Sequence, residues 1–83
     1  MNFEIEFKPR ALKDLKSLEK HEIKNIIEKI EEMKKGINNL NIKKLTNFTP
    51  EYRLRVGNYR ILFEIEDNVI TIYTISHRKN AYK

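Results

Sequence analysis

The chain has 83 residues, enough for one small domain and too few for two, so residues 1–83 are expected to fold as a single unit. It contains no cysteine, which excludes disulfide scaffolds, thiol nucleophiles and cysteine-ligated zinc. Its formal net charge of +5 favours a negatively charged partner, such as a nucleic acid or an acidic protein.

Residues 3–8 alternate apolar and charged side chains, which is the period of a β-strand with one buried face. Phe3, Ile5 and Phe7 would face the core. This alternation is unlike the apolar core of a signal peptide, and no stretch approaches the roughly 20 apolar residues that cross a bilayer. We therefore expect a cytoplasmic protein with no membrane partner.

Two helices joined as a hairpin are predicted next. Pro9 suits the first position of a helix whose apolar residues continue with helical spacing to Leu18. A second helix is expected to end at Gly36, and His21 would lie in the turn between the two. The second helix carries an apolar stripe that core packing explains, made of Ile23, Ile26, Ile27, Ile30 and Met33.

Three strands are predicted in the C-terminal half, after a loop over residues 37–50. A period of two runs from Tyr52 to Ser76, divided by the turn pairs Gly57-Asn58 and Asp67-Asn68. The expected fold class is α+β with the order βααβββ. The helical hairpin would pack on one face of a mostly antiparallel four-stranded sheet.

A basic strip is predicted on the first of these hairpins. Between Lys43 and Arg60 there are five basic residues and one acid. If Gly57-Asn58 is a two-residue turn, Arg55 lies directly opposite Arg60, with Arg53 on the same face. Like charges placed opposite each other cost up to about 1 kcal/mol. A phosphate would turn that repulsion into binding, whereas the alternative is an amphipathic hairpin whose basic face is only solvated.

The second turn extends this face. The same pairing rule places Phe63 opposite Ile72 and Arg60 opposite Ile75, so His77 would share the face of the arginines at the end where Arg60 lies. An imidazole there could exchange protons near neutral pH. A shift of one residue would reverse every assignment.

Two stretches resemble the RelE/ParE superfamily of toxins from prokaryotic toxin–antitoxin systems. They are residues 52–65, with the pattern Tyr-Arg-x-Arg-x-Gly-x-Tyr-Arg, and residues 75–82, with Ile-Ser-His-Arg and a final tyrosine. Residues 7–15 also look like the family's first strand and helix, so the resemblance covers nearly the whole chain. It implies a toxin of the RelE branch that cleaves mRNA in the ribosomal A site. The reaction would proceed by 2′-OH attack without a metal or other cofactor and would inhibit translation.

The resemblance also implies roles for individual residues. Arg53 and Arg55 match two basic strand positions that are often lysine in the family, Arg60 matches the transition-state arginine, and Tyr82 matches the C-terminal tyrosine, a base or a stacking group. The family's leaving-group acid falls near Ser76, so a neighbouring side chain would have to replace it. The catalytic set expected is Arg60, Arg55, Arg53, Tyr82 and His77, with Arg78 as the alternative acid, and the RNA-binding set is Lys43, Lys44, Arg78 and Lys79.

The partners implied are a cognate antitoxin protein, mRNA and the ribosome, with DNA reached only through the antitoxin complex. Two other functions remain open for the same fold. One is a ParE-like toxin that binds DNA gyrase and has no nuclease site. The other is an inactive regulatory member whose basic face only docks an acidic antitoxin segment and DNA.

Overall fold

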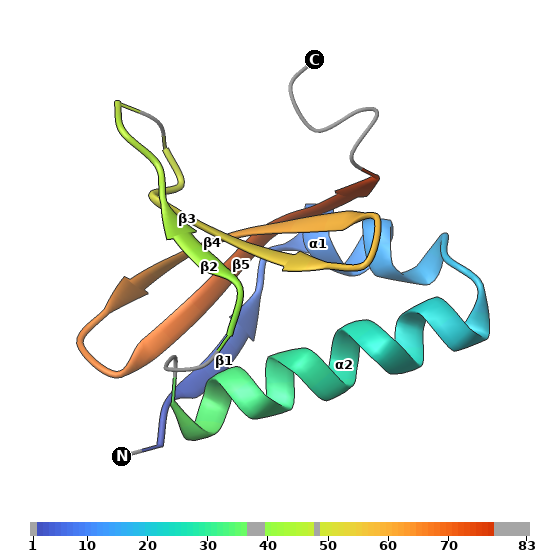
Figure 1. Ribbon diagram of the computed structural model, residues 1–83, viewed down its shortest axis with the longest axis horizontal. Coiled ribbons are helices and arrows are strands. Elements are labelled where there is room, and N and C mark those ends of the chain that lie inside the picture. The colour runs from blue at the N-terminus through green and yellow to red at the C-terminus, as the bar shows by residue number, and fades with distance from the viewer. Residues whose placement is uncertain (1, 37–39, 48, 78–83) are drawn as a thin grey trace.

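The computed structural model describes residues 2–36, 40–47 and 49–77, and this part of the chain forms two helices and five strands (Figure 1). In chain order the elements are β1 (Glu4–Phe7), α1 (Pro9–Lys16), α2 (Lys20–Lys35), β2 (Ile42–Lys44), β3 (Tyr52–Val56), β4 (Tyr59–Glu66) and β5 (Val69–His77). The two helices pack against the sheet, as Figure 1 shows for the long helix α2. The α+β class is therefore confirmed.

The five strands form one sheet in the order β1-β5-β4-β3-β2. β1 runs parallel to β5, and every other neighbouring pair is antiparallel. The sequence predicted four strands, and the structure has a fifth, because Ile42–Lys44 forms a strand that pairs with β3. The main-chain N–H of Arg55 also donates to the carbonyl of Asn41, at 3.1 Å. A strand of three residues is too short to show a period in the sequence, yet it covers an edge of β3 that would otherwise lack partners.

The helix boundaries follow local chemistry. Pro9 opens α1, where its missing N–H costs nothing. A reciprocal capping box between Glu19 and Glu22 opens α2, and Gly36 follows its last residue as expected. Neither described helix is long and apolar enough to cross a membrane.

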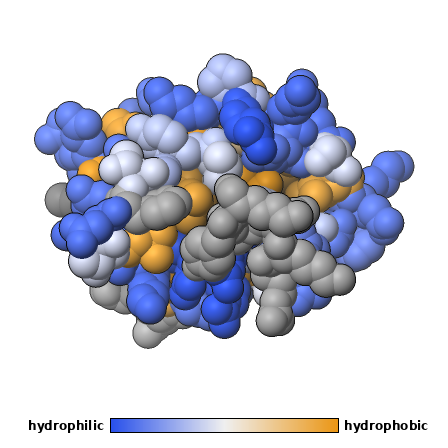
Figure 2. Space-filling model, turned by 90° about the horizontal axis from the view of Figure 1, so that it is seen from above, coloured by the Kyte–Doolittle hydropathy of each residue, from blue (hydrophilic) through white to orange (hydrophobic). Residues whose placement is uncertain are grey.

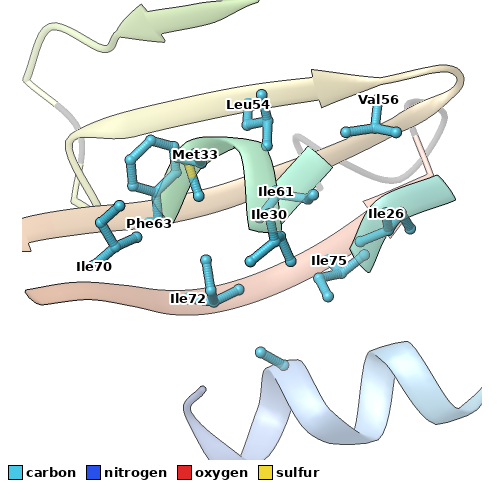
Figure 3. Close-up of a cluster of buried hydrophobic side chains, with 11 residues drawn as sticks. Ile26, Ile30, Met33, Leu54, Val56, Ile61, Phe63, Ile70, Ile72 and Ile75 are labelled. Atoms are coloured by element: carbon cyan, nitrogen blue, oxygen red, sulfur yellow. The ribbon is translucent and has the colours of Figure 1, made fainter. Parts of the chain in front are cut away.

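The hydrophobic core lies between α2 and the sheet (Figure 3). Ile26, Ile30 and Met33 point from α2 toward the strands, and each is at most 3% exposed. Burying a side chain of this size contributes roughly 1.5–3 kcal/mol. The strands contribute Leu54, Val56, Ile61, Phe63, Ile70, Ile72 and Ile75, and α1 adds Ala11.

The β3–β4 hairpin has the predicted register. Arg55 pairs with Arg60, and Leu54 pairs with Ile61 across the two-residue turn. Gly57 has a φ of 57°, in the left-handed region that glycine enters without steric cost.

The β4–β5 register agrees with prediction only at one end. Phe63 pairs with Ile72 as expected, but Leu62 pairs with Thr74, so β5 contains one extra residue, Tyr73, at a bulge. Beyond the bulge Arg60 pairs with Ser76, so the predicted pairing with Ile75 is wrong. The bulge turns Ile75 into the core, where it is 3% exposed, and an apolar side chain gains more there than Thr74 would.

Candidate functional site

The face of the sheet opposite α2, here called the outer face, carries the predicted basic strip. Arg53 and Arg55 alternate along β3 with the buried Leu54 and Val56, so the two arginines lie on the outer face. Arg60 precedes the buried Ile61 and lies on the same side. Figure 2 views the molecule from this side and shows hydrophilic side chains around hydrophobic patches.

Four cations face one another across neighbouring strands. Arg55 lies directly opposite Arg60, and Arg53 lies directly opposite Lys43 of β2. Lys43 was predicted to bind RNA, and the structure brings it beside the arginines. Both pairs join like charges, which disfavours folding unless an anion lies between them.

Two of the arginines are partly withdrawn from solvent. Arg53 and Arg60 are half-buried, whereas Arg55 is exposed. The Nε atom of Arg53 is shielded from solvent and has no hydrogen-bond partner among the described residues. The Nε and Nη1 atoms of Arg60 are shielded as well. A shielded guanidinium donor without an acceptor costs free energy, and a phosphate oxygen would supply the acceptor for Arg53.

A small cavity opens at the turn of this hairpin. Its volume is about 130 Å³, and Arg55, Asn58, Tyr59 and Arg60 line it with Gly57. One water occupies roughly 30 Å³ in the liquid, so the cavity has room for a group the size of a phosphate. Two arginines among its lining residues make it suited to an anion.

His77 lies on the other face of the sheet. It pairs with Tyr59, and the two rings meet edge to face with centroids 5.4 Å apart. The prediction that His77 shares the face of the arginines is wrong, because the extra residue at Tyr73 reverses the alternation beyond it.

Tyr59 connects the hairpin with the start of α2 through a hydrogen bond to Glu22. A hydrogen bond with the Tyr59 hydroxyl lowers the pKa of Glu22, and the nearby charges of His21 and His77 act in the same direction. The same hydrogen bond, followed by burial, raises the pKa of Tyr59. Tyr59, Glu22 and His77 therefore form a separate polar cluster on the helix side.

The remaining predicted residues are divided by the fold. Lys44 pairs with Tyr52 on the helix side of the sheet, where its Nζ lies 3.8 Å from a carboxylate oxygen of Glu51, so it is not part of the outer face. Arg78, Lys79 and Tyr82 lie outside the described residues. Within the described part, no three His, Asp or Glu side chains group closely enough to bind a metal ion.

Two hydroxyl residues lie on the outer face although the sequence did not predict them there. Ser76 lies opposite Arg60, and Thr74 lies opposite Leu62. The signal that could have revealed them is Ile75, an apolar residue one place out of the alternation set by Ile70 and Ile72. Their hydroxyl groups can donate to or accept from a ligand held by the arginines.

The far half of the outer face is acidic. Glu64 accepts a hydrogen bond from the Tyr73 hydroxyl at 3.2 Å, and the Nζ of Lys8 lies 5.4 Å from the centroid of the Tyr73 ring. Burial, followed by the charge of Glu64, raises the pKa of Tyr73. The outer face thus has a basic half near the β3–β4 turn and an acidic half near the β4–β5 turn.

Known proteins resemble the chain along nearly its whole length. A family model described as the ParE toxin of the type II toxin–antitoxin system, parDE, matches residues 5–82. Toxin RelE3 of Methanocaldococcus jannaschii is 40% identical over 81 residues, which cover 92% of this chain and 91% of that protein. RelE1 of the same organism is 36% identical over 88 residues, covering 100% of this chain and 98% of that protein.

The fold of a solved relative agrees with these matches. A crystal structure of a RelB–RelE antitoxin–toxin complex from Methanococcus jannaschii contains a chain that superposes with a TM-score of 0.80. The two chains are 36% identical, and the match covers 94% of this chain and 95% of that one. The likeness therefore includes the strands of the outer face as well as the core.

Proposed function

Because this chain belongs to the RelE/ParE superfamily of toxins from type II toxin–antitoxin systems, we propose that it is an endoribonuclease that cleaves mRNA and thereby inhibits translation. The observation that carries the proposal is the pair Arg55 and Arg60, which face each other across β3 and β4 beside a cavity. Two like charges directly opposite each other repel, and a bound phosphate would turn that repulsion into attraction.

The reaction proposed needs positive charge at one phosphate. The 2′-OH oxygen of a ribose attacks the adjacent phosphorus while its proton passes to a base. The P–O5′ bond then breaks, and the leaving oxygen takes up a proton, which yields a 2′,3′-cyclic phosphate and a 5′-OH. The phosphorane carries more negative charge than the substrate, so donors fixed around it accelerate the reaction. Arg55 and Arg60 are proposed as those donors, with Arg53 beside them.

The two proton transfers are proposed for the C-terminal residues. By resemblance to the family, Tyr82 is the candidate base. His77 packs on Tyr59 at the helix side, so the proposed outer-face chemistry uses Arg78 as the candidate acid instead. Charge stabilisation would then contribute more to the rate than proton transfer.

The proposed partners follow from the relatives and from the charge. The solved RelB–RelE complex contains an antitoxin beside its toxin, and we propose that a cognate antitoxin likewise binds and inhibits this chain. The net charge of +5 suits both an acidic antitoxin and the mRNA of a ribosome. DNA would be contacted only through the antitoxin complex.

A second candidate is inhibition of DNA gyrase by binding, because the matching family model is described as the ParE toxin. Such a toxin needs no phosphate-centred cluster. The two relatives named RelE and the opposed arginines favour the ribonuclease.

The decisive experiment maps cleavage of ribosome-bound mRNA by primer extension after expression of the wild type, Arg60→Ala and Arg60→Lys. Wild type should produce cuts at defined codon positions. Arg60→Ala should reduce cleavage by about 10²–10³-fold, as removal of one transition-state donor does elsewhere. Arg60→Lys should restore only part, since an ammonium cannot donate through two parallel N–H groups.

Unfolding in urea must show that each variant remains folded. Unchanged cleavage by a folded Arg60→Ala protein would overturn the ribonuclease assignment. Filamentation with a DNA-damage response and intact mRNA would identify the gyrase inhibitor instead.

A further inference from the structure

The charge of the outer face changes sign halfway along its strands. Cross-strand pairing arranges its side chains in four transverse rows, two basic and then two acidic. From the β3–β4 turn onward, the rows are Arg55, Arg60 and Ser76; Lys43, Arg53, Leu62 and Thr74; Glu64, Thr71 and Glu6; and Glu66, Val69 and Glu4.

The spacing of the basic rows matches a repeating anion. Successive rows are two residues apart along each strand, which is about 6.6 Å. This is similar to the separation of consecutive phosphates in a nucleic-acid strand. Neighbouring strands are about 4.8 Å apart, so the two cations of one row can reach the same phosphate. The repeat of the cations therefore runs along β3, where Arg55 and Arg53 are two residues apart, with Arg60 of β4 beside the first and Lys43 of β2 beside the second.

Each basic row places two cations directly opposite each other. Arg55 and Arg60 repel each other in the first row, and Lys43 and Arg53 do so in the second. The shielded Nε of Arg53 has no acceptor among the described residues. A phosphate on the second row would relieve the repulsion and accept from this nitrogen.

The third row disfavours a further phosphate. Glu64 is held on the outer face by the Tyr73 hydroxyl at 3.2 Å, and Glu6 lies in the same row. Lys8 adds one positive charge near Tyr73, but the two acidic rows carry four carboxylates, so this half of the face remains negative.

We propose that RNA lies along β3, not across the sheet, with two consecutive phosphates on the two basic rows and with its contact ending at the row of Glu64. This inference rests on the proposed ribonuclease function. The scissile phosphate lies on the row of Arg55 and Arg60. Lys43 and Arg53 hold the adjacent phosphate, which makes Lys43 a substrate-positioning residue.

The test measures binding of 2′-O-methyl oligonucleotides, which cannot be cleaved, with one, two or three phosphates. For the wild type, affinity should rise from one phosphate to two and change little at the third. Lys43→Gln should remove the gain from the second phosphate. It should also reduce the slope of log affinity against log salt by about 0.7, the value for one phosphate contact in a single strand.

Two further variants make the result specific. Glu64→Lys should add a gain from the third phosphate. Lys44→Gln is the matched control, because the neighbouring Lys44 lies on the helix side of the sheet and should bind as the wild type does.

The inference would be overturned if Lys43→Gln and Lys44→Gln reduced the affinity for the oligonucleotide equally. It would also be overturned if the third phosphate raised the affinity of the wild type as much as the second does. If either occurs while Arg60→Ala still reduces mRNA cleavage by about 10²–10³-fold, only the path of the RNA is wrong. A wild type that binds no oligonucleotide and cuts no mRNA would overturn the ribonuclease function too.

Discussion

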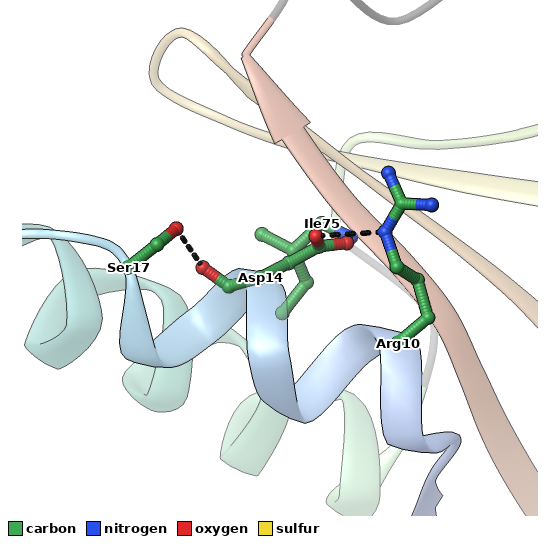
Figure 4. Close-up of polar contacts among 4 residues, drawn as sticks. All are labelled: Arg10, Asp14, Ser17 and Ile75. Atoms are coloured by element: carbon green, nitrogen blue, oxygen red, sulfur yellow. Dashed lines mark hydrogen bonds and ion pairs between the residues drawn. The ribbon is translucent and has the colours of Figure 1, made fainter.

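The carboxylate of Asp14 on α1 accepts a hydrogen bond from the main-chain N–H of Ile75 on β5, at 3.1 Å (Figure 4). β1 pairs only with residues 69–72 of β5, so the end of β5 that follows the bulge has α1 beside it in place of a strand. Asp14 supplies an acceptor that this end of the strand would otherwise lack. The contact steadies the segment that places Ser76 opposite Arg60.

Asp14→Ala should therefore destabilise the fold. Ile75 is 3% exposed, so its N–H would lose a charged acceptor in a site that water reaches poorly. The expected decrease in the free energy of unfolding is about 1.5–3 kcal/mol, measured by urea denaturation. Arg10→Ala is the control, because Arg10 also binds Asp14, at 3.0 Å, but its side chain is 71% exposed and should contribute at most about 1 kcal/mol. If the two variants lowered the free energy of unfolding equally, the hydrogen bond to Ile75 would not be the main contribution of Asp14.

Arg55→Glu should separate stability from function. The substitution replaces a repulsive cross-strand pair by an attractive one with Arg60, so the free energy of unfolding should rise by roughly 0.2–1 kcal/mol. The same change places a carboxylate where the phosphate is proposed to bind, and mRNA cleavage should be lost. Arg55→Gln removes only the repulsion and should lie between the two in stability. A variant that is less stable than the wild type would show that Arg55 and Arg60 do not repel in the folded protein.

Tyr59→Phe should weaken the dependence of stability on acid pH. The Tyr59 hydroxyl lowers the pKa of Glu22 below its ordinary value of 4.5 in the folded protein. A carboxyl with a lowered folded pKa adds stability above its ordinary pKa, and this stability is lost as the pH falls through the folded value. Without the hydroxyl, less stability is present to be lost. The measurement compares urea midpoints at neutral pH and at a pH well below 4.5, where Glu22 is protonated in the folded protein too, for both proteins.

Glu22→Gln supplies the control for this hydrogen bond. In a protein that already carries Glu22→Gln, adding Tyr59→Phe should leave the acid dependence unchanged. A further change on adding it would mean that Tyr59 acts through a different group, such as His77, whose ring it contacts.

The parts of the fold that could be predicted depend on short-range chemistry. Gly57 and Asn58 fix a two-residue turn, and that alone determines the pairing of Arg55 with Arg60. The helices follow from Pro9, Gly36 and the isoleucine stripe between them. These features act within a few residues of one another, so the sequence shows them directly.

The parts that could not be predicted depend on contacts between strands, where neighbouring residues compete for the same place in the core. Burying Ile75 stabilises the core more than burying Thr74 would. The extra residue at Tyr73 turns Ile75 toward the core and Thr74 toward the outer face. That exchange moved His77 to the helix side and placed Ser76 in the candidate site. The edge strand β2 was missed because three residues show no period, and Lys43 joined the arginines only through it.

The pairing of β1 with β5 also has a consequence for synthesis. Residues 4–7 leave the ribosome early, but their partners, residues 69–72, are among the last of the described chain to be made. Pairings so distant in sequence form late in folding. β5, which lies between β1 and β4, can therefore join the sheet and complete the row of Arg55, Arg60 and Ser76 only after its own codons have been read. A nascent chain that ends before β5 therefore lacks the complete row proposed to hold the phosphate.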